Sequence, residues 1–123
     1  LPHGFFLRPT LLCDASASSE IAQEELFGPV AVAFRYREVD DAVALANHTR
    51  FGLNSTLWGD TEMALKVAHR LRSGAVSING AVSPRPDAPT GGFKRSGNGR
   101  ESGELGFLEF FESKAVQVPL TTE

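Results

Sequence analysis

Residues 24–30 bring two carboxylates, an aromatic ring and a turn together in the order Glu-Glu-Leu-Phe-Gly-Pro-Val. A carboxylate on a stiff turn can accept two hydrogen bonds from the vicinal hydroxyls of a ribose. An aromatic side chain two residues later, here Phe27, can lie against a flat heteroaromatic ring. Gly28 permits close approach of another backbone, and Pro29 fixes the backbone where a strand begins. The same residues also fit an acidic helix end, a core Phe and a plain turn, so the residue types leave both interpretations open.

A second unusual stretch, residues 91–101, reads Gly-Gly-Phe-Lys-Arg-Ser-Gly-Asn-Gly-Arg-Glu. It opens a region, up to Gly106, that holds six of the twelve glycines. A phosphate-binding loop does not fit, because Asn98-Gly99 stands where the Walker spacing needs Lys followed by Ser or Thr. The dinucleotide pattern G-x-G-x-x-G also fails, because Ser102 occupies its last glycine position. We therefore expect a structural segment that passes close to other backbone and is tied down by ion pairs of Arg100 and Glu101.

Together, the two stretches resemble the E-E-x-F-G-P-V and G-G-[FY]-K-x-S-G-x-G-R-E segments of the NAD(P)-dependent aldehyde dehydrogenase superfamily. They occur in the family's order, and the resemblance extends from about Gly4 to about Val118. It implies that Glu25 holds the nicotinamide ribose and that Phe27 packs beside the nicotinamide ring. The implied cofactor is NAD or NADP. By the same resemblance, the residues that discriminate between NAD and NADP contact the adenosine ribose and lie outside the region that this chain matches.

The resemblance also implies a reaction, the oxidation of an aldehyde to a carboxylic acid through a cysteine thiohemiacetal, with a glutamate as general base. In the family, the nucleophile precedes the region that this chain matches. Cys13, the single cysteine, has no helix N-terminus or neighbouring base in sequence to activate it, so we interpret it as structural. We expect no catalytic residue in this chain, which alone would be inactive. The alternative is a non-catalytic structural or assembly module derived from such an enzyme.

The loop over residues 80–90 is rich in proline and small residues. By resemblance it lines the substrate entrance, which implies a role for Ser83, Pro84 and Arg85. Family members often carry bulky aromatics there, so the departure leaves the choice of aldehyde open. In some members, backbone carbonyls that match those of Lys94 and Gly97 help to hold a monovalent cation.

Composition narrows the class of protein further. The 123 residues carry a net charge of −3 and a pI of about 5.6, which favours neither a nucleic-acid nor an anionic-membrane partner. Apolar runs reach about five residues, too short to span a bilayer. One cysteine excludes an internal disulfide and fits a reducing compartment, so we expect a cytoplasmic protein. The three histidines have no ligand spacing among themselves or with Cys13, and we expect no metal site.

Alternating strand and helix patterns predict an α/β fold with parallel strands and flanking helices. Asp40 is the expected N-cap of the first long helix, and Asp60 that of the second. Glu62 and Lys66 should form an i, i+4 ion pair on the second helix. The predicted strands are 30–37, 53–58, 75–79 and 114–118, and the predicted longer helices are 41–48, 61–73 and 100–112, after a short helical turn over 20–25.

The domain organisation follows from the resemblance. Residues 1–113 should form the C-terminal part of the catalytic domain, and residues 114–123 the terminal oligomerisation strand and tail. The chain opens with Leu1 rather than methionine, and the family is several times longer, so we expect a sequence truncated at its N-terminus. The expected partners are an aldehyde substrate, the N-terminal remainder of the enzyme, and further copies in a homo-dimer or homo-tetramer.

Overall fold

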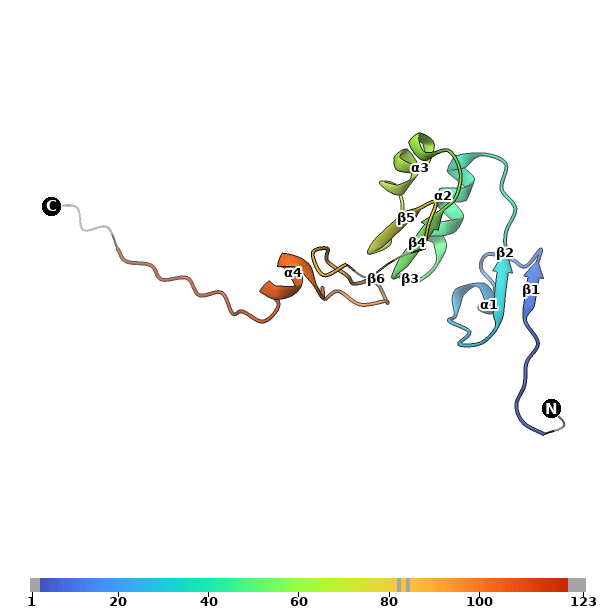
Figure 1. Ribbon diagram of the computed structural model, residues 1–123, viewed down its shortest axis with the longest axis horizontal. Coiled ribbons are helices and arrows are strands. Elements are labelled where there is room, and N and C mark those ends of the chain that lie inside the picture. The colour runs from blue at the N-terminus through green and yellow to red at the C-terminus, as the bar shows by residue number, and fades with distance from the viewer. Residues whose placement is uncertain (1–2, 82, 84, 120–123) are drawn as a thin grey trace.

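The computed structural model describes residues 3–81, 83 and 85–119. It confirms an α/β chain in which short strands alternate with helices along the sequence (Figure 1). The elements in chain order are β1 (Thr10–Cys13), α1 (Glu20–Gln23), β2 (Val30–Ala33), α2 (Val39–His48), β3 (Phe51–Gly52), β4 (Asn54–Leu57), α3 (Thr61–Ala68), β5 (Ala75–Ile78), β6 (Phe93–Lys94) and α4 (Gly103–Leu108).

The first structural unit is the parallel pair β1–β2, joined through α1. Its register runs from Thr10 opposite Val30 to Cys13 opposite Ala33. The backbone N–H of Thr10 also donates to the carbonyl of Pro29 at 2.9 Å, so the pairing starts at the Gly-Pro turn. This unit fixes the segment between α1 and β2, which carries Glu25 and Phe27.

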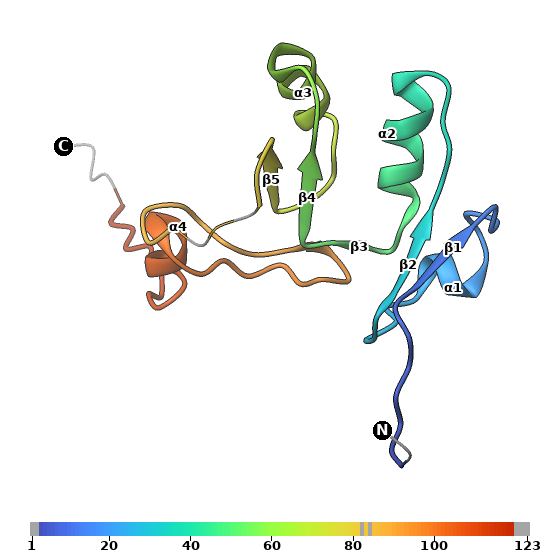
Figure 2. The same cartoon turned by 45° about the vertical axis from the view of Figure 1, so that its right-hand side comes forward.

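The second unit is the parallel pair β4–β5 with α3 between its strands in sequence. Asp60 caps α3 by accepting the backbone N–H of Met63 at 2.9 Å, and Glu62 pairs with Lys66 at 2.8 Å, as predicted. The side chain of Asn79 exchanges two hydrogen bonds of 2.9 Å with the backbone of Gly59, which ties the end of β5 to the start of α3. Helix α2 lies between the two parallel strand pairs (Figure 2).

Residues 91–101, here called the glycine clasp, hold the end of α2, β3 and the start of β5 together. Strand β6 of the clasp pairs antiparallel with β3. A Cβ atom on Gly74 would collide with the carbonyl of Gly91, so the absence of a side chain at Gly74 allows these backbones to touch. The predicted structural role is therefore confirmed. The predicted ion pairs are wrong: Arg100 donates to three backbone carbonyls, and Glu101 exchanges backbone hydrogen bonds of 2.7 Å with Thr90.

Several predicted boundaries are also wrong, most of them because an element ends early. Helix α2 begins at Val39 with Glu38 as N-cap, and Asp40 instead lies in its first turn and pairs with Arg70 at 2.6 Å. Strand β2 ends at Ala33, α3 ends at Ala68, and α4 covers only part of 100–112. Within the described residues, the strands form three separate two-stranded sheets, of which β1–β2 and β4–β5 are parallel as predicted. Residues 114–118 are not a strand in this chain, because no described segment pairs with them.

The chain buries little of its apolar surface. Its accessible surface is 10485 Å², whereas a compact monomer of this mass exposes only about 6,400 Å². Among the described residues, the buried apolar side chains are those of Val43 and Ala64. The segment after α4 runs away from the body of the molecule (Figure 1). None of the described helices has the length and apolar character needed to cross a membrane.

Candidate functional site

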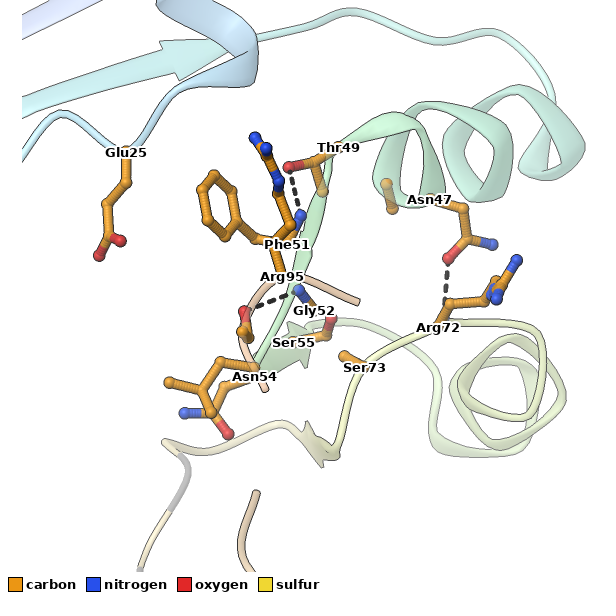
Figure 3. Close-up of a pocket in the computed structure, with 13 residues that line it drawn as sticks. Glu25, Asn47, Thr49, Phe51, Gly52, Asn54, Ser55, Arg72, Ser73 and Arg95 are labelled. Atoms are coloured by element: carbon orange, nitrogen blue, oxygen red, sulfur yellow. Dashed lines mark hydrogen bonds between the residues drawn. The ribbon is translucent and has the colours of Figure 1, made fainter. Parts of the chain in front are cut away.

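Glu25 lies in the turn that follows α1, and its side chain projects into a hollow of about 560 Å³ (Figure 3). The hollow is named here the Glu25 hollow. It is lined by the end of α2, residues 51–55, residues 72–73 and residues 95–96, together with Glu25 itself. Four separate parts of the sequence thus line the hollow, and Glu25 lies at one side of it (Figure 3).

The two adjacent glutamates have different surroundings. The carboxylate of Glu24 forms an ion pair with the guanidinium of Arg50 at 2.7 Å. Within the part of the chain that the structure describes, the carboxylate of Glu25 forms no ion pair. Glu25 therefore keeps its oxygen atoms available to accept hydrogen bonds from a ligand that enters the hollow.

Polar contacts to backbone hold the walls of the Glu25 hollow in place. The Asn47 side chain accepts the N–H of Arg72 at 2.7 Å and donates to the carbonyl of Arg70 at 2.8 Å, which joins α2 to the segment after α3. The hydroxyl of Ser96 accepts the N–H of Gly52 at 3.0 Å, which joins the glycine clasp to β3. Both contacts bridge segments far apart in sequence, so the hollow is a product of the fold.

Lys94 supports the same wall through the end of α2. Its half-buried ammonium donates to the carbonyls of Asn47 and Thr49, both at 3.0 Å, and so satisfies groups that a helix C-terminus leaves unpaired. Burial lowers the pKa of Lys94 below its ordinary value, and the nearby charge of Arg72 adds to this shift. Lys94 also has a positive φ of 56°, a conformation that a non-glycine residue adopts at some energetic cost.

The other predicted site residues do not line the Glu25 hollow. Phe27 is 99% exposed, so in this chain its ring lies against nothing. Ser83 and Arg85 are exposed in the loop over 80–90, and Pro84 lies outside the described residues. Arg85 donates two hydrogen bonds to the carboxylate of Asp87, at 2.9 and 2.6 Å, and this contact lowers the pKa of Asp87 and raises that of Arg85.

Two basic residues of the Glu25 hollow, Arg72 and Arg95, escaped the sequence analysis. Arg95 occupies the variable position of the G-G-[FY]-K-x-S-G segment, and Arg72 follows a helix with no motif of its own. A basic residue at each position was visible in the sequence, but the patterns gave no sign that both would line the same hollow.

The other residues considered from the sequence are Cys13, possible metal ligands and the carbonyls expected near a cation. Cys13 is exposed at the end of β1, opposite Ala33, and its interpretation as structural stays a prediction. In the described ranges, no three His, Cys, Asp or Glu side chains gather as a metal site would require. The carbonyl of Lys94, one of the two expected near a cation, accepts the N–H of Gly97 at 3.3 Å in a tight turn.

Comparison with known proteins identifies close relatives. Residues 1–116 match the model of the aldehyde dehydrogenase family. A succinate-semialdehyde dehydrogenase [NADP(+)] of Deinococcus radiodurans is 47% identical over 115 residues, which are 93% of this chain and 24% of the relative. A crystal structure of an aldehyde dehydrogenase C mutant from Pseudomonas syringae, in complex with NAD+ and octanal, superposes with a TM-score of 0.82 at 48% identity.

That superposition covers 92% of this chain and 23% of the Pseudomonas enzyme. An NAD+ complex of an aldehyde dehydrogenase from Bacillus cereus gives a TM-score of 0.85 at 34% identity, over 98% of this chain and 25% of that enzyme. The chain therefore spans about a quarter of the length of the relatives that it matches.

Proposed function

Since the chain belongs to the aldehyde dehydrogenase family, we propose that it forms the C-terminal part of an enzyme that oxidises an aldehyde to a carboxylic acid. The position within the enzyme rests on the two motif segments, which by resemblance follow the catalytic cysteine. The nucleophile and the general base then lie outside this chain. The chain contributes one wall of the cofactor site and part of the substrate entrance.

The observation that carries this proposal is the free carboxylate of Glu25 in a hollow built from four segments. The residues present fit a nicotinamide nucleotide, because a carboxylate with two available oxygens can accept both vicinal hydroxyls of a ribose. When bound, the nicotinamide supplies the hydride acceptor of the reaction. Glu25 orients the ribose, and through the ribose it fixes the ring relative to the aldehyde carbon.

Phe27 and the loop over 80–90 have supporting roles in the proposal. The ring of Phe27 follows Glu25 by two residues and is fully available, since it is 99% exposed in this chain. We assign it to one face of the nicotinamide ring. Ser83, Pro84 and Arg85 contribute to the substrate entrance, where the Arg85–Asp87 pair leaves no uncompensated charge on the loop.

The relatives support the cofactor and the substrate class. The Pseudomonas structure contains NAD+ and octanal, and the Deinococcus relative is named for NADP(+) and a semialdehyde. We accordingly propose NAD or NADP as cofactor and an aldehyde as substrate. We also propose that residues 114–118 become a strand at a contact between subunits of a homo-oligomer in the cytoplasm.

The test compares the complete protein with the isolated chain. Formation of NADH or NADPH is followed by absorbance with a panel of aliphatic and carboxylate-bearing aldehydes. We expect turnover by the complete protein and none by the chain alone, because the nucleophile and base are supplied elsewhere. Reduction of the cofactor by the isolated chain that disappears in Cys13→Ala would contradict the structural interpretation of Cys13. An inactive complete protein that still assembles would support the non-catalytic module instead.

A further inference from the structure

We propose that Arg50 is a positioning residue for the cofactor, because its ion pair with Glu24 sets where the neighbouring Glu25 carboxylate stands in its hollow. The inference rests on the proposed function, since it concerns the same carboxylate. The Glu24–Arg50 pair contains no residue that would touch the ribose.

The polar contacts between the two parts of the chain lead to Arg50. Glu25 belongs to the unit of β1, α1 and β2, whereas every other lining residue of the Glu25 hollow belongs to residues 38–119. Among the described residues, two side-chain polar contacts connect these parts. One is the Glu24–Arg50 ion pair at 2.7 Å, and the other joins the Ser18 hydroxyl to His48 Nε2 at 3.5 Å. Of these two contacts, only the ion pair is shorter than 3 Å, and its carboxylate belongs to Glu24, the residue next to Glu25.

Apolar contacts do not fix the position of Glu25 by themselves. Ala22 and Phe34 of the first part line a hollow together with Leu45 of α2. Such contacts bring surfaces together without fixing direction, and no apolar side chain of the first part is fully buried among the described residues. A charged hydrogen bond has a defined length and direction, so it can set the orientation that apolar contacts leave open.

The backbone at Arg50 is held by two residues of the glycine clasp, which makes Arg50 a suitable anchor. Its carbonyl accepts the N–H of Arg95 at 3.0 Å, so the glycine clasp holds its backbone. The preceding carbonyl, that of Thr49, accepts from the ammonium of Lys94 at 3.0 Å. The guanidinium therefore extends from a fixed base toward a turn that has few other polar contacts. Arg50 links the clasp to the ribose-binding carboxylate without touching the ligand.

This geometry predicts a larger effect on function than on stability. The two side chains are 50% and 42% exposed, and such ion pairs contribute little to folding. Displacement of a catalytic partner by about 1 Å, in contrast, can slow a reaction on the order of a hundredfold. Loss of the pair should therefore slow hydride transfer while the melting temperature barely changes.

The experiment uses the complete enzyme with Arg50→Gln, Glu24→Gln, the double variant and the charge exchange Glu24→Arg with Arg50→Glu. The matched control is Arg70→Gln, because Arg70 is 46% exposed and pairs with Asp40 within the second part of the chain. The readouts are the Kd for NAD or NADP, the single-turnover rate of hydride transfer and the melting temperature. We expect each single variant to slow hydride transfer roughly tenfold and the double variant to slow it no further.

The charge exchange should restore most of the rate, whereas Arg70→Gln should leave the rate and the Kd unchanged. Additive losses in the double variant, or a rate for Arg50→Gln equal to wild type, would overturn the inference. The variant Glu25→Gln, measured in parallel, separates this failure from failure of the proposed function. If Glu25→Gln slows hydride transfer and Arg50→Gln does not, Arg50 has no positioning role while the ribose site stands. If neither has an effect, the ribose site itself is wrong.

Discussion

Glu24 and Glu25 are adjacent and carry the same charge, but the structure gives them different surroundings. Glu24 pairs with Arg50, and Glu25 faces a hollow. The residue types alone fitted both a ribose-binding carboxylate and a plain acidic helix end. Only the resemblance to the family pointed to Glu25 as the ribose-binding residue. The Arg50 contact depends on residues 26 positions away, so no local pattern could reveal it.

Phe27 offers a first prediction at the scale of residues. Its ring is 99% exposed in this chain, so Phe27→Ala removes little packing within the chain itself. In the complete enzyme the same change should weaken cofactor binding, because the nicotinamide ring loses an aromatic neighbour. Fluorescence titration with NAD or NADP measures this loss, and an unchanged Kd would show that Phe27 does not meet the ring.

Lys94 provides a prediction about pH. Its pKa in the folded chain lies below the ordinary 10.5, because burial and the charge of Arg72 disfavour the ammonium. Between the folded pKa and 10.5, the unfolded chain binds more protons than the folded chain at this residue. The contribution of Lys94 to the free energy of unfolding should therefore rise with pH in that window.

The pKa of Lys94 can be measured by NMR titration of its ε-carbon, assigned by the loss of the signal in Lys94→Arg. A midpoint below 10.5 agrees with the effects of burial and of the charge of Arg72. A midpoint at or above 10.5 would show that the hydrogen bonds to the two carbonyls outweigh burial.

At the scale of elements, the sequence patterns located most helices and strands but missed where several of them end. Asp60 was a correct N-cap, since its carboxylate accepts the N–H of Met63. Asp40 was not, because Glu38 precedes it and starts α2 earlier. Both acidic residues fit a cap by type, and the choice depends on backbone geometry. The antiparallel pairing of β3 with β6 was beyond local patterns, since these strands meet across about 40 residues.

The glycine clasp gives the prediction that belongs to this scale. Gly74→Ala should lower the stability of the complete enzyme by roughly 1–3 kcal/mol, because the new Cβ atom would collide with the Gly91 carbonyl. The matched control is Gly99→Ala in the same clasp, where nothing lies within 4 Å of the added atom. Thermal denaturation compares the two variants. Equal melting temperatures would mean that the clasp and the start of β5 do not touch.

The whole molecule is more exposed than a self-sufficient domain of its size. Its accessible surface exceeds the expected value by about 4,000 Å². The rings of Phe107, in α4, and Phe111, just after it, pack in a tilted arrangement with their centroids 4.8 Å apart, yet both remain more than half exposed. Open strand edges and apolar patches of this kind promote association.

We therefore expect the isolated chain to self-associate and to become soluble when co-expressed with the proposed N-terminal part. Changing Phe107 and Phe111 to serine should reduce self-association and also prevent rescue by that part. Trp58→Ser is the control, because Trp58 is 74% exposed at the end of β4, away from α4. Sedimentation velocity measures the outcome. A compact monomer that unfolds cooperatively would mean that the chain is a self-sufficient domain.

The central claim, that Glu25 holds the nicotinamide ribose, is tested most directly by single-turnover hydride transfer in the complete enzyme. Glu25→Gln keeps the shape of the side chain but removes the charge that strengthens its hydrogen bonds. Glu20→Gln, the same change at an exposed position of α1, is the control. We expect Glu25→Gln to slow hydride transfer roughly tenfold to a hundredfold, from about 1.5–3 kcal/mol for a charged hydrogen bond. The control should match wild type, and a Glu25→Gln rate equal to wild type would contradict the claim.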